Sequence, residues 1–398
     1  MNYKIYFGLE RDDCELEPQF IGAWEFMADF ESLYTSASLT LNDFTRTYYN
    51  QIQKGMNIIF KFYDGDHVTN SQKIYTNTMK VLSFDKIPAP QSLFNDTTNF
   101  LLVNSLYFDD NKPDTKSYNG TVYSIASSVL LDYPKVKKDF SLTDDAASPR
   151  YQSGDTAFKF LKRISKFGIQ NDLPVYLYMD ATNTLKLKGI KEMINSASFY
   201  TAAPLLDNEI PQYTAESSST SSNKIELSNY RFSSEGKDIS SSTSTYFEIE
   251  NFTSNDAFYP GSVFNNTEIN NVQTAALTPP SINFLNWNLN PHDAYSIAKR
   301  QEFEKSINSY FLVATTPGLR ADALHPGSLV KVLLPYDTIN IGGQEKNLGE
   351  GEYLVKRVKY IFDGDAVFTQ LYLIQANYYQ RKPPKKLNKY YELWYLRS

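Results

Sequence analysis

The sequence predicts a mostly β protein with α+β insertions, in which two β-barrel units are connected by smaller α/β domains. Three observations favour this fold class. Short runs of alternating apolar residues occur near both ends of the 398-residue chain, and a loosely repeated glycine-led strand pattern links the two ends. Between them, helical and strand patterns are mixed. A chain of this length has room for two to four domains, each with its own core.

The composition fits a soluble globular protein, with 41% hydrophobic and 21% charged residues. Tyrosine and phenylalanine are numerous, at 30 and 26, and tyrosine suits both half-buried sheet faces and protein interfaces. The net charge of −6 excludes a global basic field that would attract nucleic acid to the outer surface, but leaves a locally basic channel open. Cys14 is the only cysteine, so neither an internal disulfide nor a cysteine-based zinc site is expected.

The N-terminal sequence MNYKIYFGLERDD lacks the basic head and the apolar run of a signal peptide. No window approaches the run of about 18 apolar residues that a membrane-spanning helix needs. We therefore expect no membrane-spanning segment, and we expect the protein to be made and assembled in a cytoplasm.

Residues 1–113 are expected to be mostly β. Period-two alternation predicts strands over 31–43, 54–66, 78–85 and 99–110. The last strand is expected to place four apolar side chains on one face: Phe100, Leu102, Leu106 and Phe108. Asp64-Gly65 predicts a turn after the second strand. Strands this short and frequent indicate a sandwich or a barrel.

Residues 114–200 change in character and are expected to form a small α+β unit. A helix is predicted over 154–168, where apolar residues recur every three positions: Phe158, Leu161, Ile164 and Phe167. Ser153 or Asp155 is expected to cap its start, and Gly168 to adopt the left-handed conformation at its end. Residues 174–189 predict a hairpin with its turn at 181–183.

The Ser-rich stretch 215–250 allows two interpretations. Its composition alone is typical of a linker, whereas scattered apolar residues such as Ile225, Tyr230 and Phe247 favour strands joined by polar loops. A second helix is expected within 290–318, with Asn290 as its cap and Pro291 in its first turn.

The clearest strand pattern lies near the C-terminus. A strand is predicted in 325–336, and a strand pair in 351–375 turns at Asp363-Gly364. Gly327-x-x-Val330-x-Val332 in this region matches Gly55-x-x-Ile58-x-Phe60 near the N-terminus. The match favours a duplicated β unit, and two unrelated runs of antiparallel sheet are the alternative. A duplication would let three chains present six similar units around a ring.

In this region the chain resembles the baseplate hub protein of contractile phage tails. The resemblance lies in the order of elements within AYSIAKRQEFEKSINSYFLVATTPG, HPGSLVKVLLPY, GEYLVKRVKYIFDG and VFTQLYLIQANYY. They run as a helix, a strand ending near Pro-Gly, a second Pro-Gly strand, a Tyr-Leu-Val strand and a closing hairpin strand. The segment DTAFKFLKRISKFGI…LPVYLYMDATNTLKLKG is similar to the small α/β insertion of that family. Related hubs occur in non-contractile tails and in secretion-system spikes, so the tail type stays open.

The resemblance implies two tail-tube-like β-barrel domains plus smaller α/β domains. The first barrel would be 1–113, followed by the α+β insertion domain at 114–200. The second barrel would be discontinuous, from 201–250 and 308–376, with a connecting domain containing a helix at 251–307. The Ser-rich stretch is more polar than barrel strands usually are. A basic aromatic C-terminal tail is expected at 377–398, and the residues beyond Tyr379 have no clear match in the family.

The resemblance also implies a function. The chain would be a structural hub protein of a bacteriophage tail or baseplate, a homotrimer with a pseudo-six-fold ring. The ring would join the tail tube protein to the central spike protein, contact other baseplate or tail proteins, and give a conduit for DNA ejection. It would belong to the virion after assembly in the host cytoplasm. The alternatives are a glycan-binding or host-attachment β-sandwich module, and a tail-associated hydrolase.

Residues with catalytic potential do not form a recognisable site. The three histidines, His67, His292 and His325, lack metal-ligand spacing. Acidic neighbours that a glycosidase could use are Asp109-Asp110, Asp144-Asp145, and Glu302 with Glu304. Such neighbours in turns and on helix faces are usually solvated. The glycine-rich segment 342–351 predicts a hairpin loop, because no helix follows it as in a phosphate loop. We expect no catalytic, cofactor-binding or metal site, no cofactor and no enzymatic activity.

The C-terminal tail combines basic residues with aromatic ones. Arg381, Lys382, Lys385, Lys386 and Lys389 form the basic run, and Tyr390, Tyr391, Trp394 and Tyr395 follow it. The basic run is expected to dock on an acidic partner protein in the phage tail, with the aromatic rings as anchors. A solvated terminus is the alternative.

Overall fold

The computed structural model of the chain describes most of residues 3–204 and several separate strands after them. The described residues are 3–43, 48, 51–64, 73–87, 96–110, 112–171, 173–196, 199–204, 224–233, 244–248, 253–257, 293, 296–297, 300, 303, 311–319, 324–332, 338–341, 344–347, 351–364 and 366–375. Several predictions fall outside these residues: the turn at Asp64-Gly65, His67, His292, Glu302, Glu304 and the tail at 377–398.

Six strands near the N-terminus form one antiparallel sheet, which we call the N-terminal strand group. They are β1 (Tyr3–Phe7), β2 (Ile21–Asp29), β3 (Ser36–Asp43), β4 (Asn57–Asp64), β5 (Lys73–Ile87) and β6 (Asp96–Asn104). Their order across the sheet is β1-β4-β5-β6-β3-β2. Alternate side chains enter one core, where Ile58, Phe60 and Phe62 of β4 are fully buried, as the period-two pattern predicts.

Helical turns connect some of these strands. Two 3-10 helices, η1 (Asp12–Cys14) and η2 (Pro18–Phe20), lie between β1 and β2. The strand predicted over 99–110 was wrong in its second half, because β6 ends at Asn104 and Leu106–Asp109 form the short helix α1. The side chain of Asn104 accepts a hydrogen bond from the N–H of Leu106 at 3.1 Å, which favours a turn over a continued strand.

The next segment is an α+β insertion, as predicted. Its elements are β7 (Thr115–Gly120), α2 (Val122–Val129), η3 (Leu130–Asp132), β8 (Lys137–Phe140), β9 (Ser148–Ser153), α3 (Ala157–Ile164), η4 (Ser165–Phe167), β10 (Ile169–Gln170), β11 (Leu173–Met179), β12 (Thr184–Gly189) and α4 (Ile190–Ser196). Four strands form a sheet in the order β10-β11-β12-β8, and β7 pairs with β9. Side chains of α2 and α3 share a core with β11 and β12. The predicted hairpin is confirmed, with Asn183 at φ +60° in its turn.

The predicted caps of the helix in 154–168 were wrong at both ends. Thr156 is the N-cap of α3, and its side chain makes no capping bond. Instead Asp110, at the end of α1, accepts hydrogen bonds from the Phe158 N–H at 3.2 Å and from the Thr156 hydroxyl at 2.6 Å. Gly168 is extended, with φ −72°, because the chain passes directly from η4 into β10. A carboxylate brought by the fold thus replaces the local cap.

Seven strands from the second half of the chain form what we call the C-terminal strand group. They are β13 (Phe199–Pro204), β14 (Lys224–Leu227), β15 (Asn229–Ser233), β18 (Phe311–Pro317), β19 (Leu329–Val332), β22 (Gly351–Asp363) and β23 (Ala366–Gln375). Their order is β15-β18-β23-β22-β19-β13-β14. The predicted turn at Asp363-Gly364 is confirmed, with Gly364 at φ +64°. The strands β16 (Ser244–Glu248) with β17 (Thr253–Ala257), and β20 (Thr338–Ile341) with β21 (Gln344–Asn347), form separate pairs.

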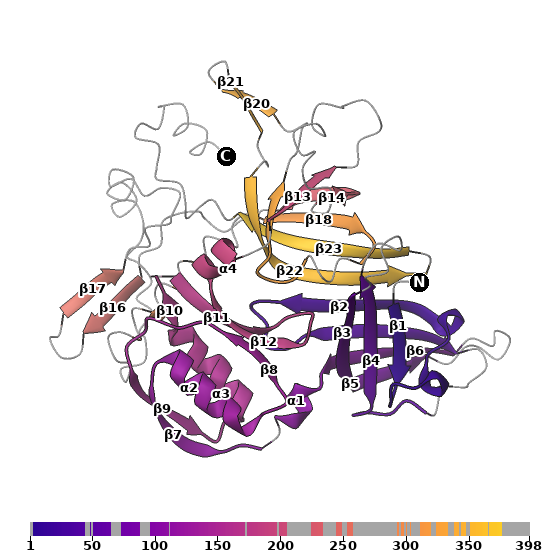
Figure 1. Ribbon diagram of the computed structural model, residues 1–398, viewed down its shortest axis with the longest axis horizontal. Coiled ribbons are helices and arrows are strands. Elements are labelled where there is room, and N and C mark those ends of the chain that lie inside the picture. The colour runs from indigo at the N-terminus through magenta and orange to yellow at the C-terminus, as the bar shows by residue number, and fades with distance from the viewer. Residues whose placement is uncertain are drawn as a thin grey trace.

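The two strand groups are one sheet, because β2 pairs antiparallel with β22 (Figure 1). A single apolar cluster runs through both groups. A second cluster lies inside the insertion, and a third connects β11 to Phe303 and to β22. A helix is expected within 290–318. The structure describes five residues of its first part, and all are helical: 293, 296–297, 300 and 303. The predicted fold class, mostly β with α+β insertions, is confirmed, and the exact domain boundaries stay predictions.

Candidate functional site: the open edges of the joined sheet

The pairing of β2 with β22, which we call the in-chain junction, joins segments far apart in sequence. Ala23 to Asp29 of β2 pair with Asp363 to Arg357 of β22. On the core face, the Phe26 ring is stacked on Tyr360, with centroids 5.8 Å apart and planes at 12°. On the opposite face, Lys359 and Glu25 form an ion pair at 2.8 Å. The in-chain junction therefore has an aromatic side and a charged side.

The two strand groups share one strand order. Reading across the sheet, β4-β5-β6-β3-β2 corresponds to β19-β22-β23-β18-β15, and every neighbouring pair in both runs is antiparallel. The groups differ beyond this run, since β1 is antiparallel to β4 whereas β13 is parallel to β19. The repeated sequence pattern therefore marks a repeated five-strand topology.

The repeated glycines make the same backbone contacts. Gly55 has φ +82° and Gly327 has φ +90°, a conformation that favours glycine. The N–H of Gly55 donates to the carbonyl of Val81, and that of Gly327 donates to the carbonyl of Val355, both at 2.8 Å. Directly after each valine the pairing with the next strand is shifted by one residue. Val81 and Val355 are therefore equivalent positions.

The equivalent strands β5 and β22 both lose their first partner strand at this shift, and only β22 gains a second one. In β22, residues up to Leu354 pair with β19, and residues from Arg357 onward pair with β2. In β5, pairing with β4 ends at Lys80, and the later residues pair only with β6. Among the described residues, no strand pairs with the other edge of β5 at 83–87. This edge is the counterpart of the in-chain junction, without its partner strand.

The strand β15 has an open edge as well. Its counterpart β2 pairs with β3 on one side and with β22 on the other, whereas β15 pairs with β18 and with no other described strand. The joined sheet of thirteen strands therefore contains a run of eight, β15-β18-β23-β22-β2-β3-β6-β5, with an open edge at each end among the described strands. In Figure 1, β18, β23, β22, β2 and β3 lie one below another in this order. Open edges of this kind favour pairing with another strand.

The two candidate acidic pairs within the described residues, Asp109-Asp110 and Asp144-Asp145, serve the structure. Asp109 forms an ion pair with Lys80 at 3.1 Å, and Asp110 binds the start of α3. Asp144 accepts a hydrogen bond from the Asn171 N–H at 2.7 Å. Asp145 accepts one from the N–H of Val122, at the start of α2, at 2.8 Å, and burial raises the pKa of this carboxyl despite that bond. Each carboxylate thus has a local structural role.

His325 and the described residues of the glycine-rich segment also have structural roles. His325 lies before Gly327, and its Nδ1 is 2.6 Å from the Ser328 hydroxyl. In the segment 342–351, where a hairpin loop is predicted, residues Gln344–Asn347 form the strand β21 opposite β20, so a hairpin is present but these residues are one of its strands and not its loop. The described residues contain no cluster of three or more potential metal ligands. None of the described helices has the length and apolar character needed to cross a membrane.

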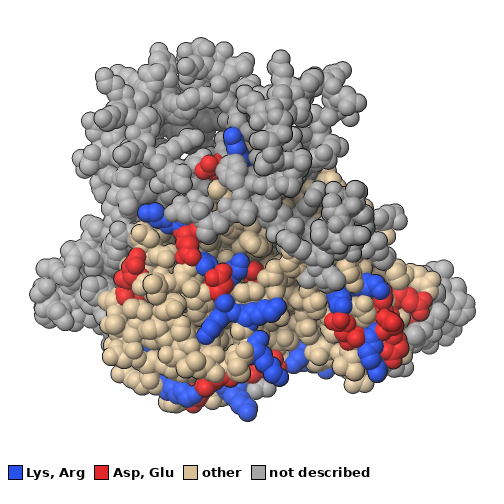
Figure 2. Space-filling view, viewed as in Figure 1, with Lys and Arg blue, Asp and Glu red and all other residues tan. Residues whose placement is uncertain are grey.

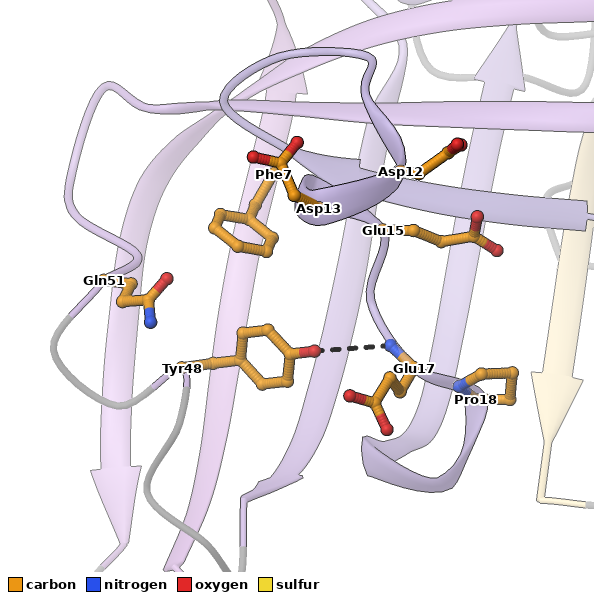
Figure 3. Close-up of a pocket in the computed structure, with 8 residues that line it drawn as sticks. All are labelled: Phe7, Asp12, Asp13, Glu15, Glu17, Pro18, Tyr48 and Gln51. Atoms are coloured by element: carbon orange, nitrogen blue, oxygen red, sulfur yellow. Dashed lines mark hydrogen bonds between the residues drawn. The ribbon is translucent and has the colours of Figure 1, made fainter.

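One shallow pocket of about 420 Å³ lies beside the turns between β1 and β2 (Figure 3). It is lined by Phe7, Asp12, Asp13, Glu15, Glu17, Pro18, Tyr48 and Gln51. Two of its carboxylates form ion pairs, Glu15 with Lys4 at 2.9 Å and Asp13 with Arg11 at 3.1 Å. On the face shown in Figure 2, basic and acidic residues of the described part are mixed. Neither feature indicates catalysis, so the open edges are the candidate functional site.

No protein-family model and no curated protein matches the chain. Two solved structures are similar over almost the whole chain. A tail protein from Neisseria meningitidis MC58 covers 96% of this chain and 99% of its own, with a TM-score of 0.59 and 13% identity. The 43 kDa tail protein of prophage MuSo2 from Shewanella oneidensis covers 95% of this chain and 100% of its own, with a TM-score of 0.58 and 14% identity. The chain has the fold of these tail proteins, as the resemblance in its sequence implies.

Proposed function

We propose that the chain is a structural hub protein of a bacteriophage tail or baseplate and acts as a homotrimeric ring in the virion. The observation that carries this proposal is the run of eight strands within the joined sheet, with one open edge at each end. Two different edges that pair head to tail generate a ring when the rotation between copies closes. Because each chain holds two strand groups of like topology, three chains would present six, in pseudo-six-fold symmetry.

The same geometry supports a conduit. Three copies of the eight-strand run would give a closed sheet of 24 strands (three times eight). With strands about 4.8 Å apart and tilted by about 40°, such a barrel is roughly 50 Å across between backbones. Barrels of this size do not fill their interior with side chains. We propose that DNA passes through this opening during ejection.

The face of the sheet that points away from the core suits such a channel. Ser38 and Asn99 are exposed on this face in the N-terminal strand group, together with Leu101 opposite Ser38, and the ion pair of Glu25 with Lys359 lies on it at the in-chain junction. Small polar groups and paired charges offer few free cations to phosphates, so a moving DNA strand would not be held. The proposed partners are the tail tube protein on one side of the ring and the central spike protein on the other.

The role proposed here is non-enzymatic, and it is tested first by the oligomeric state. We expect light scattering during size-exclusion chromatography to give three times the monomer mass. We expect electron microscopy of virions to place the ring at the distal end of the tail tube. A stable monomer with affinity for host glycans would contradict the hub and favour the attachment module. Loss of a hydrolytic activity on replacing one carboxylate would favour the hydrolase.

A further inference from the structure

The proposed ring leaves open which strands meet between subunits, and the in-chain junction gives the answer. We propose that 83–87 of β5 in one subunit pairs with β15 of the next subunit, in the register that β22 makes with β2. We also propose that an ion pair between Asp85 and Arg231 directs this pairing, with the two charges reversed relative to Lys359 and Glu25. This inference rests on the proposed ring and specifies its interface.

The equivalence of Asp85 and Lys359 follows from the shared glycine contacts. Val81 and Val355 accept the same glycine hydrogen bond and precede the same shift in register. Asp85 and Lys359 each lie four residues after their valine. Within their sheets, Asp85 is opposite Asn99 on β6, and Lys359 is opposite Gln370 on β23. The two positions thus carry opposite charges on equivalent strands.

The equivalence of Arg231 and Glu25 follows by counting across the strands between. In one group Arg357 is opposite Tyr372, which is opposite Val313, which is opposite Arg231. In the other group Ser83 is opposite Leu101, which is opposite Ser38, which is opposite Glu25. Arg357 and Ser83 each lie two residues after the equivalent valines. Arg231 therefore occupies the position of Glu25.

The register of the in-chain junction then sets the contacts between subunits. Glu25 is opposite Ile361 and reaches Lys359 along the diagonal. Transferred to the open edges, this register places Arg231 opposite Ile87 and brings its guanidinium to Asp85. Arg231 and Asp85 are both exposed in the single chain. A cross-strand pair of opposite charge stabilises antiparallel pairing.

Apolar exposure on β5 supports the same partner. Phe84 is 36% exposed, although its equivalent Val358 in the in-chain junction is fully buried. Ile87 is 55% exposed at the position that corresponds to Ile361. A strand added at this edge would cover both side chains, as β2 covers β22. A second copy of the chain is therefore the partner that fits this edge, because its β15 matches β5 in strand pairing, in charge and in the apolar surface that it would cover.

The reversed charges make each strand edge prefer its own partner, both at the in-chain junction and at the proposed pairing of β5 with β15 between subunits. If β5 of one copy competed for β2, Asp85 would approach Glu25. If β15 competed for β22, Arg231 would approach Lys359. Both exchanges bring like charges together, which disfavours them, while the two proposed pairings bring opposite charges together. The charges thus favour pairing of β22 with β2 within a chain and pairing of β5 with β15 between chains over the two mixed pairings.

The pairing is tested by disulfides at matched rungs of the two junctions. In a Cys14→Ser background, Ile87→Cys with Arg231→Cys is expected to give a covalent trimer on a non-reducing gel, because each bond joins two chains. Glu25→Cys with Ile361→Cys occupies the same rung of the in-chain junction and is expected to give an oxidised monomer. Mass spectrometry identifies the bonded peptides.

The outcomes separate this inference from the proposed function. The pairing would be overturned, and the hub left in place, by three results together. The protein is a trimer by light scattering, the in-chain control variant forms its disulfide, and the variant with cysteines at positions 87 and 231 does not. A chain that stays monomeric at every concentration, with no bond between chains, would overturn both.

A charge exchange tests the role of the ion pair itself. Asp85→Lys or Arg231→Glu alone is expected to raise the concentration at which the trimer dissociates about tenfold or more, because each ring holds three such pairs. The double variant is expected to recover the trimer. Asp12→Lys changes an exposed carboxylate away from both edges and should have no effect. Single variants that behave as Asp12→Lys does would overturn the charge-directed pairing.

Discussion

At the scale of single residues, a buried ion pair ties the insertion to the helix that follows it in the chain. Arg150 of β9 and Asp293 are both almost fully buried. The guanidinium donates two hydrogen bonds to the carboxylate, one of them at 2.6 Å, and its centre lies 4.2 Å from the Phe167 ring centroid. Desolvation offsets much of the attraction in such a pair, so the larger cost arises when one partner is removed alone.

We expect Asp293→Ala to lower the free energy of unfolding by about 3–5 kcal/mol, because it leaves the Arg150 charge buried and unpaired. Arg150→Met with Asp293→Leu should recover most of this loss. Urea titrations followed by circular dichroism measure both. Asp132→Ala, which breaks an exposed ion pair with Lys116, is the control and should leave the midpoint unchanged. A double variant as unstable as the single one would show that the buried charge is not the cause.

At the scale of elements, the two long strands β5 and β22 each shift register after an equivalent valine and lose their first partner strand there. Each valine accepts a hydrogen bond from a glycine in the left-handed region, which lies before the neighbouring strand β4 or β19, and the two glycines differ in their surroundings. A Cβ at Gly55 would meet open space, whereas one at Gly327 would lie 2.9 Å from the hydroxyl of Tyr178. That hydroxyl already donates a hydrogen bond to the carbonyl of Pro326 at 3.2 Å.

The two glycines make a matched pair of variants. We expect Gly55→Ala to lower the free energy of unfolding by about 1 kcal/mol through backbone strain alone. Gly327→Ala should cost clearly more, because it adds a clash between packed elements. Thermal unfolding of the two variants under one condition measures the difference. Equal losses would mean that Tyr178 moves aside without cost.

The elements also show what the sequence can predict. The glycine repeat was predictable, because a positive φ in the turn before two equivalent strands favours glycine at both places. The alternation in β4 and the hairpin of β11 with β12 were predictable because both are local. The helix α1 and the capping of α3 by Asp110 were missed, because they depend on a distant carboxylate and on one asparagine side chain.

The candidate site could not be predicted from the sequence, because it too depends on contacts between residues far apart in the chain. Nothing near Asp85 or Arg231 indicates that they occupy the positions of Lys359 and Glu25, since the match runs through three strand registers. A weak trace exists in the spacing Val81-x-x-Phe84-x-x-Ile87, which recurs as Val355-x-x-Val358-x-x-Ile361. Such a spacing arises often by chance, and the backbone contacts are needed to give it meaning.

At the scale of the whole molecule, the joined sheet has one continuous core. Tyr360 is fully buried in this core. Its ring is stacked on Phe26 and its centroid lies 5.4 Å from that of Phe62. The Tyr360 hydroxyl donates a hydrogen bond to the carbonyl of Leu324 at 3.0 Å. The same ring therefore contacts β2 and β4 of the N-terminal group from a strand of the C-terminal group.

We expect Tyr360→Ala to lower the free energy of unfolding by about 3–5 kcal/mol and to split one calorimetric transition of the two strand groups into two. Tyr360→Phe keeps the ring and removes the hydroxyl that bonds to Leu324, so it should keep a single transition with a modest loss, about 1 kcal/mol. Differential scanning calorimetry distinguishes these results. A single transition in Tyr360→Ala would mean that the groups are coupled elsewhere.

The in-chain junction also has a consequence for biosynthesis. Asp29 and Arg357, which bond across it at 2.7 Å, are 328 residues apart. At about 5–20 residues per second, a ribosome takes roughly 15–65 s to translate that stretch. Throughout this interval the outer edge of β2 has no strand to bind, while neighbouring nascent chains on the same messenger expose identical edges. Protection of β2 during translation, by a chaperone or by slow pairing elsewhere, is therefore a condition for a good yield of correctly folded chains.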